Sequence, residues 1–344
     1  MECSPTAFPN DGPIPLYSSL SAPRTTTTGP KSKKSSHGRF VGENRNLEKP
    51  YLRLTDYPKK EAVRPLEVVI KSLAHIKSRY CQEEDFEWAN EQLKSVRQDL
   101  TVQAIRNKFV LDVYETHARI LLEHGDLNEF NQCQTVIRTL TQGSVGLEKD
   151  TTDSSEYFQG ELAALCCEED SDDKALRQSD ISADEFRGYG FLYALVRNSW
   201  SDLKTELVRT RETLAAVVKD ENHSHSDRTS NCMHALQVVT AVNANDYRNF
   251  FRLYDSAPYM SAYLMDFLVK RVRDSAFERI IAAYRPTVSV EHFRECLFFQ
   301  DLDETRLFLQ ESGAVFVQEK GEPLFFVDCK ASGTSGKKSD PRLY

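Results

Sequence analysis

The chain has 344 residues, enough for one large or two smaller buried cores, and it carries 44 Lys and Arg against 52 Asp and Glu residues. The acidic residues are concentrated, because residues 143–185 hold 13 acidic and 3 basic residues, which leaves 41 basic and 39 acidic residues elsewhere. A near-neutral body can carry a basic face, whereas a uniformly acidic one repels phosphate. The overall charge therefore does not exclude a nucleic-acid partner.

The 8 cysteines are scattered without a CxxC pair, and the N-terminus lacks the apolar core of a signal peptide. No apolar run approaches the ~20 residues that a membrane helix requires. We therefore expect a soluble intracellular protein with reduced cysteines.

Residues 1–45 are rich in Ser, Thr, Pro and Gly and show no apolar periodicity, which predicts a disordered tail. Lys31, Lys33 and Lys34 fit either a weak nuclear-import signal or a solvated linker. From Arg64 onward, apolar residues recur every three to four positions, as in amphipathic helices. The four helices predicted here carry their apolar residues between Leu66 and Ile76, Phe86 and Val96, Phe109 and Leu121, and Phe130 and Leu140.

Residues 145–181 break this pattern and predict an acidic, inserted loop, with a short helix possible between Tyr157 and Cys167. Ser182 and Glu185 have the spacing of a capping box, so a helix is expected to begin there. Further helices are predicted near 183–198, 201–219, 228–243, 245–255 and 260–284. Asp126 with Phe130 and Asp246 with Phe250 form a faint internal repeat, typical of helix pairs stacked in a solenoid.

The last part of the chain has a different pattern. Two helices are predicted near 290–299 and 302–312, the second capped by Asp301 and Glu304 and ended by Gly313. Two strands, at 315–317 and 324–327, follow around a turn. Helices followed by a β-hairpin are typical of a winged helix. The expected organisation is thus a tail (1–45), a helical-repeat region (46–285), a winged helix (286–329) and a second disordered tail (330–344).

Catalytic motifs are weak in this sequence. His223 and His225 have the H-x-H spacing of one metalloprotease signature, but Met233 and Leu236 stand where its Ser and Asp belong. Cys166 and Cys167 neighbour an acidic run, which raises rather than lowers a thiol pKa. A Gly-rich phosphate loop and a nucleophile elbow are both missing, and His117 lies on a dense amphipathic helix, where a core role is expected. We expect a protein that is not an enzyme and uses no cofactor, metal or small-molecule substrate.

Two groups of basic residues are candidates for phosphate contacts, and mixed-charge helix faces are the alternative explanation for both. The first group lies within residues 248–285 and the second within residues 94–108. The nucleic-acid-binding candidates are Arg248, Arg252, Lys270, Arg271, Arg273, Arg285, Arg97, Arg106 and Lys108, with Arg279 and Lys94 nearby. The partner-binding candidates are Phe298, Phe299, Phe325 and Phe326; their helical or strand spacing indicates mainly core positions, and those that are exposed would mark a partner surface.

Several ordered segments resemble the Sac-three/GANP family, and within it the branch of Thp-three and leukocyte receptor cluster member eight. The matching segments are Tyr51–Thr55, Val63–Val68, Gln92–Gln103, Val113–Arg119, Glu129–Gln134 and Phe250–Tyr254. The resemblance covers roughly residues 41–328. It implies a mostly α, TPR-like solenoid followed by a C-terminal winged helix, together called a PCI-type domain.

The resemblance also implies a function. Members are non-catalytic scaffolds that pair with a second PCI-domain protein, recruit a small acidic Sem-one-like protein and bind RNA or DNA. They act in nuclear complexes for transcription-coupled mRNA processing or export, with a cytoplasmic pool possible. The acidic insertion is longer than the family pattern, and the long N-terminal region of larger members is missing. A structural subunit of a proteasome-lid or initiation-factor-like assembly, or a centrosomal adaptor, stays an alternative.

Overall fold

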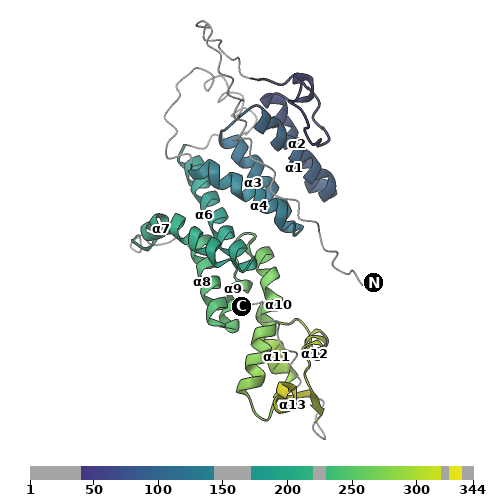
Figure 1. Cartoon of the computed structure of the whole chain (residues 1–344), viewed down its shortest axis with the longest axis vertical. Helices are drawn as coiled ribbons and strands as arrows, with labels where there is room; N and C mark the ends of the chain where they lie inside the picture. Colours follow the sequence, from purple (N-terminus) through teal and green to yellow (C-terminus); the bar gives the residue numbers. More distant parts are fainter. Residues whose placement is uncertain (1–39, 143–171, 220–229, 319–324, 335–344) are drawn as a thin grey trace, which may run out of the picture. The chain divides into compact units, whose positions relative to one another are not determined.

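Helices dominate the computed structural model, which describes residues 40–142, 172–219, 230–318 and 325–334 (Figure 1). The expected mostly α class is therefore confirmed. A short 3-10 turn, η1 (Lys60–Ala62), comes first, and the N-terminal helices are α1 (Leu66–Glu83), α2 (Phe86–Val102), α3 (Lys108–Glu123) and α4 (Leu127–Gln142). The middle helices are α6 (Asp172–Val196), α7 (Trp200–Lys219), α8 (Asn231–Ala244), α9 (Tyr247–Asp255) and α10 (Ser261–Ala283).

The helices begin where short polar side chains satisfy the free amides of a first turn. Asp85 caps α2, Asn107 caps α3 and Asp246 caps α9, each by accepting a bond from the amide three residues on. Asp126 accepts the same bond from Glu129 at the start of α4. The predicted repeat of Asp126 and Asp246 is thus also a repeat in structure, and the phenylalanine four residues after each is fully buried.

Successive helices pack on their neighbours in the chain: α1 on α2, α2 on α3, and α3 on α4. The helix α6 then contacts α7, α8 and α10. One continuous cluster of buried apolar side chains runs from Val69 in α1 to Cys329 near the end of the described chain. Packing against neighbouring helices buries the apolar stripe of each helix, and this stripe produces the apolar periodicity of three to four residues in the sequence.

The segment before α1 is held on α2 by a buried ion pair. The Arg64 guanidinium lies 2.6 Å from the Asp99 carboxylate, and both side chains are almost fully buried. Lys49 forms a second ion pair with Asp99. Gly42 lies against the backbone of Val63, at a distance that leaves no space for a Cβ atom. Residues 40–45, expected to belong to the disordered tail, are therefore part of this packed segment.

The start of α6 differs from the prediction, because the helix begins at Asp172 and runs through Ser182. The prediction of a capping box at Ser182 and Glu185 is therefore wrong. Glu185 is instead buried, where it accepts two hydrogen bonds from Arg119 of α3, at 2.9 and 2.7 Å. It also accepts one from the Tyr189 hydroxyl, whose oxygen accepts the Met260 amide hydrogen just before α10. The glutamate that looked like a cap thus joins α3, α6 and the entry to α10.

A second junction lies where α8 begins. The Asn231 side chain donates to the Glu185 carbonyl (2.7 Å) and accepts from the Ser261 hydroxyl (2.8 Å), so it links α6, α8 and α10. Gly188 of α6 lies directly beneath it, and a Cβ atom there would come within 2.3 Å of the Asn231 amide nitrogen. A glycine is required at this position because any side chain would separate the two helices.

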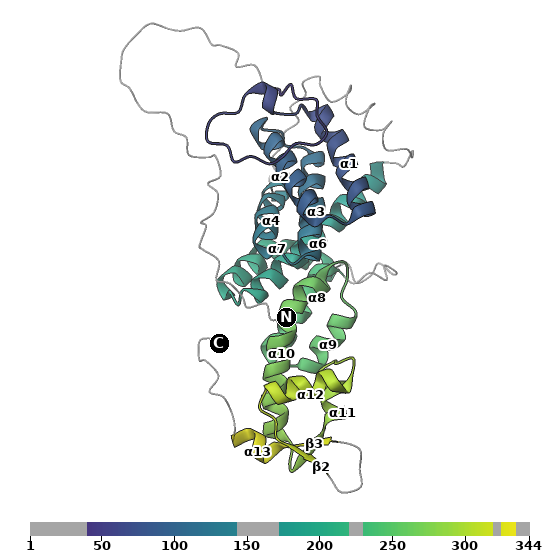
Figure 2. The same ribbon diagram turned by 90° about the vertical axis from the view of Figure 1, so that its right-hand side faces the viewer.

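The C-terminal part contains β1 (Thr287–Ser289), α11 (Val290–Cys296), α12 (Leu302–Glu311), β2 (Phe316–Gln318), β3 (Phe325–Asp328) and α13 (Cys329–Thr334). In Figure 2 these elements lie around the C-terminal half of α10. The three strands form an antiparallel sheet in the order β1-β3-β2, with Val288 opposite Val327 and Val317 opposite Phe326. The strand β1 was not predicted, and α13 extends into the expected C-terminal tail.

Several predictions fall outside the described residues. They are the acidic run before Asp172, the short helix between Tyr157 and Cys167, the His223 and His225 pair, and the turn between the last two strands.

Candidate nucleic-acid and partner interfaces

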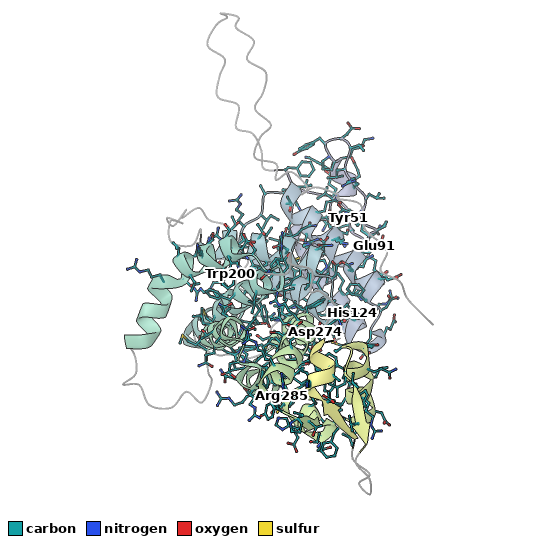
Figure 3. The ribbon with its side chains drawn as sticks, turned by 60° about the horizontal axis from the view of Figure 1, so that its bottom comes forward. Tyr51, Glu91, His124, Trp200, Asp274 and Arg285 are labelled. Carbon is teal, nitrogen blue, oxygen red and sulfur yellow. The ribbon has the colours of Figure 1, made fainter. Side chains whose placement is uncertain are left out.

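Basic residues of α9 and of the turn after α10 are linked through side chains of α11. Arg248 and Arg252 lie one turn apart on α9, and both are exposed. The Arg248 guanidinium donates to the Cys296 sulfur (3.2 Å), and this sulfur lies 3.5 Å from Nε2 of His292. The His292 ring is in turn 5.4 Å from the Tyr284 ring, which precedes the exposed Arg285. We call Arg248, Arg252, Tyr284, Arg285 and His292 the α9–α11 surface, and Arg285 is labelled in Figure 3.

The α9–α11 surface combines cations with two flat rings. Arg252 is held by Asn249 (2.6 Å), and Arg285 donates to the carbonyl oxygens of Ile281 and Tyr284, so both guanidinium groups keep other N–H groups free to bind a phosphate. Tyr284 is exposed, so its face is open to a stacked base. Exposed cations beside an exposed aromatic ring are the groups that contact phosphates and stack on bases in single-stranded nucleic acid.

Other predicted cations of the first group are used inside the protein. Arg273 donates to the Leu297 carbonyl (3.0 Å) and the Phe298 carbonyl (2.8 Å), and its guanidinium lies 3.7 Å from the centre of the Phe299 ring. It satisfies carbonyl groups that the end of α11 leaves free. Arg271 donates to the Leu195 carbonyl at the end of α6. Burial lowers the pKa of both arginines, which is a measure of how far each is removed from water.

The remaining cations of α10 do not join the same face. A helix turns by about 100° per residue, so Lys270 and Arg279 point in opposite directions. Lys270 is exposed and forms an ion pair with Asp274 one turn later (3.7 Å). Arg279 is exposed. The helical spacing of these residues in the sequence therefore does not produce one basic stripe along α10.

The second basic group also contains both buried and exposed residues. Arg97 is buried between helices, where it pairs with Glu129 and donates to the Cys133 sulfur (3.0 Å), while Lys94 lies 3.7 Å from the same glutamate. Arg106 and Lys108, in contrast, are exposed on either side of Asn107, the cap of α3. Cations at a helix N-terminus oppose the helix dipole, so helix stability does not explain them.

The candidate phenylalanines are mainly core residues. The Phe298 ring stacks on Phe251 with 5.9 Å between their centroids, and Phe299 is buried. Phe326 is half-buried in the central strand β3, and Phe325 pairs by its backbone with Gln318 of β2. The exposed apolar residues of this part are Leu307 on α12 and Val315 and Val317 at β2, the edge strand. The alternation of Val315 and Val317 is visible in the sequence, but the position of β2 at an edge of the sheet is not.

The described residues contain no cluster of three or more His, Cys, Asp or Glu side chains arranged to hold a metal ion. Nor do they include a helix that is long and apolar enough to cross a membrane. His117 is buried and its Nε2 atom lies 2.9 Å from the Asn90 side-chain oxygen. Burial, reinforced by Arg97 and Lys94, lowers its pKa well below the usual value, so it remains neutral at physiological pH. This is the core histidine that the sequence predicts.

Comparison with known proteins identifies the family. Residues 43–318 match the model of the SAC3/GANP family. A leukocyte receptor cluster member 8 homolog of Xenopus laevis is 34% identical over 295 residues, which are 86% of this chain and 31% of that protein. A THP3 homolog of Schizosaccharomyces pombe is 34% identical over 280 residues, covering 81% of this chain and 59% of the relative.

Two further relatives agree. SAC3 family protein A of Arabidopsis thaliana is 30% identical over 308 residues, 86% of this chain and 26% of that protein. Protein THP3 of Saccharomyces cerevisiae is 46% identical over 101 residues. The chain spans from about a quarter to about three fifths of the length of the first three relatives. The chain belongs to the SAC3/GANP family and matches its THP3 and leukocyte receptor cluster member 8 branch.

Proposed function

We propose that the protein is a non-catalytic PCI-type scaffold that binds RNA through the α9–α11 surface in a nuclear complex for transcription-coupled mRNA processing or export. The observation that carries this proposal is the series of contacts from Arg248 through Cys296 and His292 to Tyr284, which precedes Arg285, with the exposed Arg252 one turn from Arg248 on α9. Cations next to exposed rings bind single-stranded nucleic acid without reading its sequence. Membership of the family supports the same role.

The C-terminal part is proposed to be a winged helix. Its element order is β1, α11, α12, β2 and β3, with β3 in the middle of the sheet. The strand β2 lies at an edge of the sheet, and Val315 and Val317 at this strand and Leu307 on α12 are exposed. A second PCI-domain protein is proposed to bind here, because main-chain pairing at a sheet edge and exposed apolar side chains together form a stable interface. A small acidic Sem-one-like protein and the solenoid form of the helical region are part of the same proposal.

Fluorescence anisotropy with a labelled single-stranded RNA tests the RNA contact. The variant Arg248→Glu with Arg252→Glu should bind about tenfold more weakly at moderate salt, because two phosphate contacts are lost and two repulsive charges are gained. Its log affinity should fall less steeply with log salt, by about 0.7 for each contact removed. The matched control is Lys59→Glu with Lys71→Glu, which makes the same charge change on exposed residues elsewhere. Equal affinities of the two variants would contradict the proposal.

A protein-only function is the second candidate, as in a proteasome-lid or initiation-factor-like subunit or a centrosomal adaptor. The observation that favours it is that Arg97, Arg271 and Arg273 bind partners inside the protein instead of a phosphate. Purification of the tagged chain from its own cells separates the two. Recovery of RNA with a second PCI-domain protein supports the scaffold for mRNA complexes, and recovery of lid or initiation-factor subunits without RNA supports the alternative.

A further inference from the structure

One side of α7 packs on α6, and the described part of its opposite side is exposed. Leu203, Glu206 and Thr210 are buried, and they recur at the three- and four-residue spacing of a single helix face. Figure 1 shows α7 beside α6, and among the described helices α6 is its main packing partner. A helix with one buried face normally has a polar surface opposite. The exposed face of α7 departs from this rule.

The exposed face of α7 is apolar and basic. Trp200 is 49% exposed, Leu207 39% and Val208 76%, and Trp200 is labelled in Figure 3 on the first turn of the helix. Lys204 and Arg211 are exposed too, and a rotation of about 100° per residue places all five within an arc of about 100°. Asp202 and Arg209 lie outside this arc. We call these five residues the α7 face.

A stripe of this composition fits an acidic segment that also carries apolar side chains. Three large apolar residues exposed to water on one helix face are typical of a surface that binds a partner. Two cations interleaved with them favour a partner of negative charge, because complementary charge speeds docking and fixes its orientation. Helices with apolar residues at this spacing commonly bind another amphipathic segment.

The chain itself contains such a segment, and it follows directly on a helix that contacts α7. Segment 143–171 connects the end of α4 with the start of α6. In the last turns of α4, Arg138 lies 3.2 Å from Glu206 of α7. The helices α6 and α7 are joined by a short turn and pack on each other.

The sequence of segment 143–171 complements the α7 face. It contains eight acidic residues and one basic residue. Apart from Val145 and Leu147, its large apolar residues are grouped at Tyr157, Phe158, Leu162 and Leu165, with Glu156 and Glu161 among them. With 29 residues it is long enough to span α7, whose 20 residues measure about 30 Å.

We propose that segment 143–171 docks on the α7 face of the same molecule, its acidic residues binding Lys204 and Arg211 and its apolar residues covering Trp200, Leu207 and Val208. Attachment at both ends gives the segment an effective concentration in the millimolar range, so a weak contact is sufficient. The proposal concerns a surface distinct from the α9–α11 surface and does not depend on RNA binding.

Hydrogen–deuterium exchange of the full chain tests this docking. In a variant whose residues 143–171 are replaced by a Gly/Ser linker of equal length, amides of residues 200–211 should exchange about tenfold faster, given a millimolar effective concentration and a Kd on the order of 100 µM. Removal of residues 1–39 is the matched control and should leave exchange in α7 unchanged. Equal exchange in the full chain and the linker variant overturns the proposal.

Charge reversal separates docking from a loss of folding. Lys204→Glu with Arg211→Glu should reproduce the faster exchange in α7, and adding Glu161→Lys with Glu168→Lys should restore protection. Protection that appears after the addition of a separate acidic peptide, or that depends on protein concentration, assigns the α7 face to another molecule and overturns the proposal. If the linker variant unfolds, the unmodified chain still tests the proposal. At 0.5 M salt the amides of α7 should exchange faster than at low salt, because exposed charges are then screened.

Discussion

The arginines of the N-terminal part and those around α9–α11 occupy different environments. Arg64, Arg97 and Arg119 each bind a carboxylate of another segment, and each is buried or half-buried. Arg248, Arg252 and Arg285 remain exposed, with partners that leave most of their N–H groups free. The difference shows that a basic cluster in sequence indicates a binding surface only where tertiary carboxylates and carbonyls have not already used its charges.

The largest expected effect lies in the N-terminal region. Asp99→Ala leaves the buried Arg64 without a counter-ion and Lys49 without its main partner, so the free energy of unfolding should fall by about 3–5 kcal/mol. Denaturant unfolding measures this change. Asp303→Ala, which removes an exposed carboxylate that pairs with Arg306, is the control and should cost less than about 1 kcal/mol. Similar losses for the two variants would remove the distinction between internal and surface pairs.

Arg273→Met carries the comparison into the α9–α11 region. It should lower the free energy of unfolding by about 2–3 kcal/mol, because two carbonyl groups at the end of α11 lose a charged donor. The RNA affinity of the folded variant should stay within about twofold of the unmodified chain, since this guanidinium faces inward. A large loss of RNA affinity without loss of stability would place Arg273 among the binding residues instead.

The dependence of stability on pH tests a buried group that neither region exposes. His117 has a lowered pKa in the folded state, so the unfolded chain binds its proton first as the pH falls below about 6.5. The stabilising contribution is therefore present above about pH 6.5 and is lost toward pH 5, by up to about 1.4 kcal/mol per pH unit. His117→Gln should flatten this decline in denaturant titrations. An unchanged slope for His117→Gln would show that other groups control the acid limb.

The smallest expected effect lies at the start of α3. Arg106→Glu with Lys108→Glu should raise the free energy of unfolding by less than about 1 kcal/mol, because acidic residues favour a helix N-terminus. RNA affinity should fall about threefold if this second exposed group also contacts phosphate. Thermal melts and anisotropy measure the two quantities, and a drop in stability would contradict the helix-dipole argument.

The helices were predictable because their signals are local. Asp85, Asn107, Asp246 and Asp301 each cap a helix with a bond to an amide three residues away, which a sequence displays directly. Glu185 looked like a cap for the same reason, but its carboxylate bonds with Arg119, 66 residues away, determine its position. The short strand β1 was missed because its three residues become a strand only by pairing with β3, some forty residues later. Which arginines remain free depended on the same kind of distant contact.

The junction around Tyr189 and Asn231 has a consequence for the order of events during synthesis. The Tyr189 hydroxyl can bond to the Met260 amide only after 71 more residues have been synthesised. Asn231 can bond to the Ser261 hydroxyl only after 30 more residues. At about 5–20 residues per second, the ribosome needs roughly 4–14 s to deliver the partner of Tyr189. During that interval α1 to α4 can assemble through neighbouring contacts, while α6 still presents uncovered apolar surface to chaperones. A ribosome stalled within α8 or α9 would therefore hold a chain in which α1 to α4 are packed and the apolar surface of α6 is exposed.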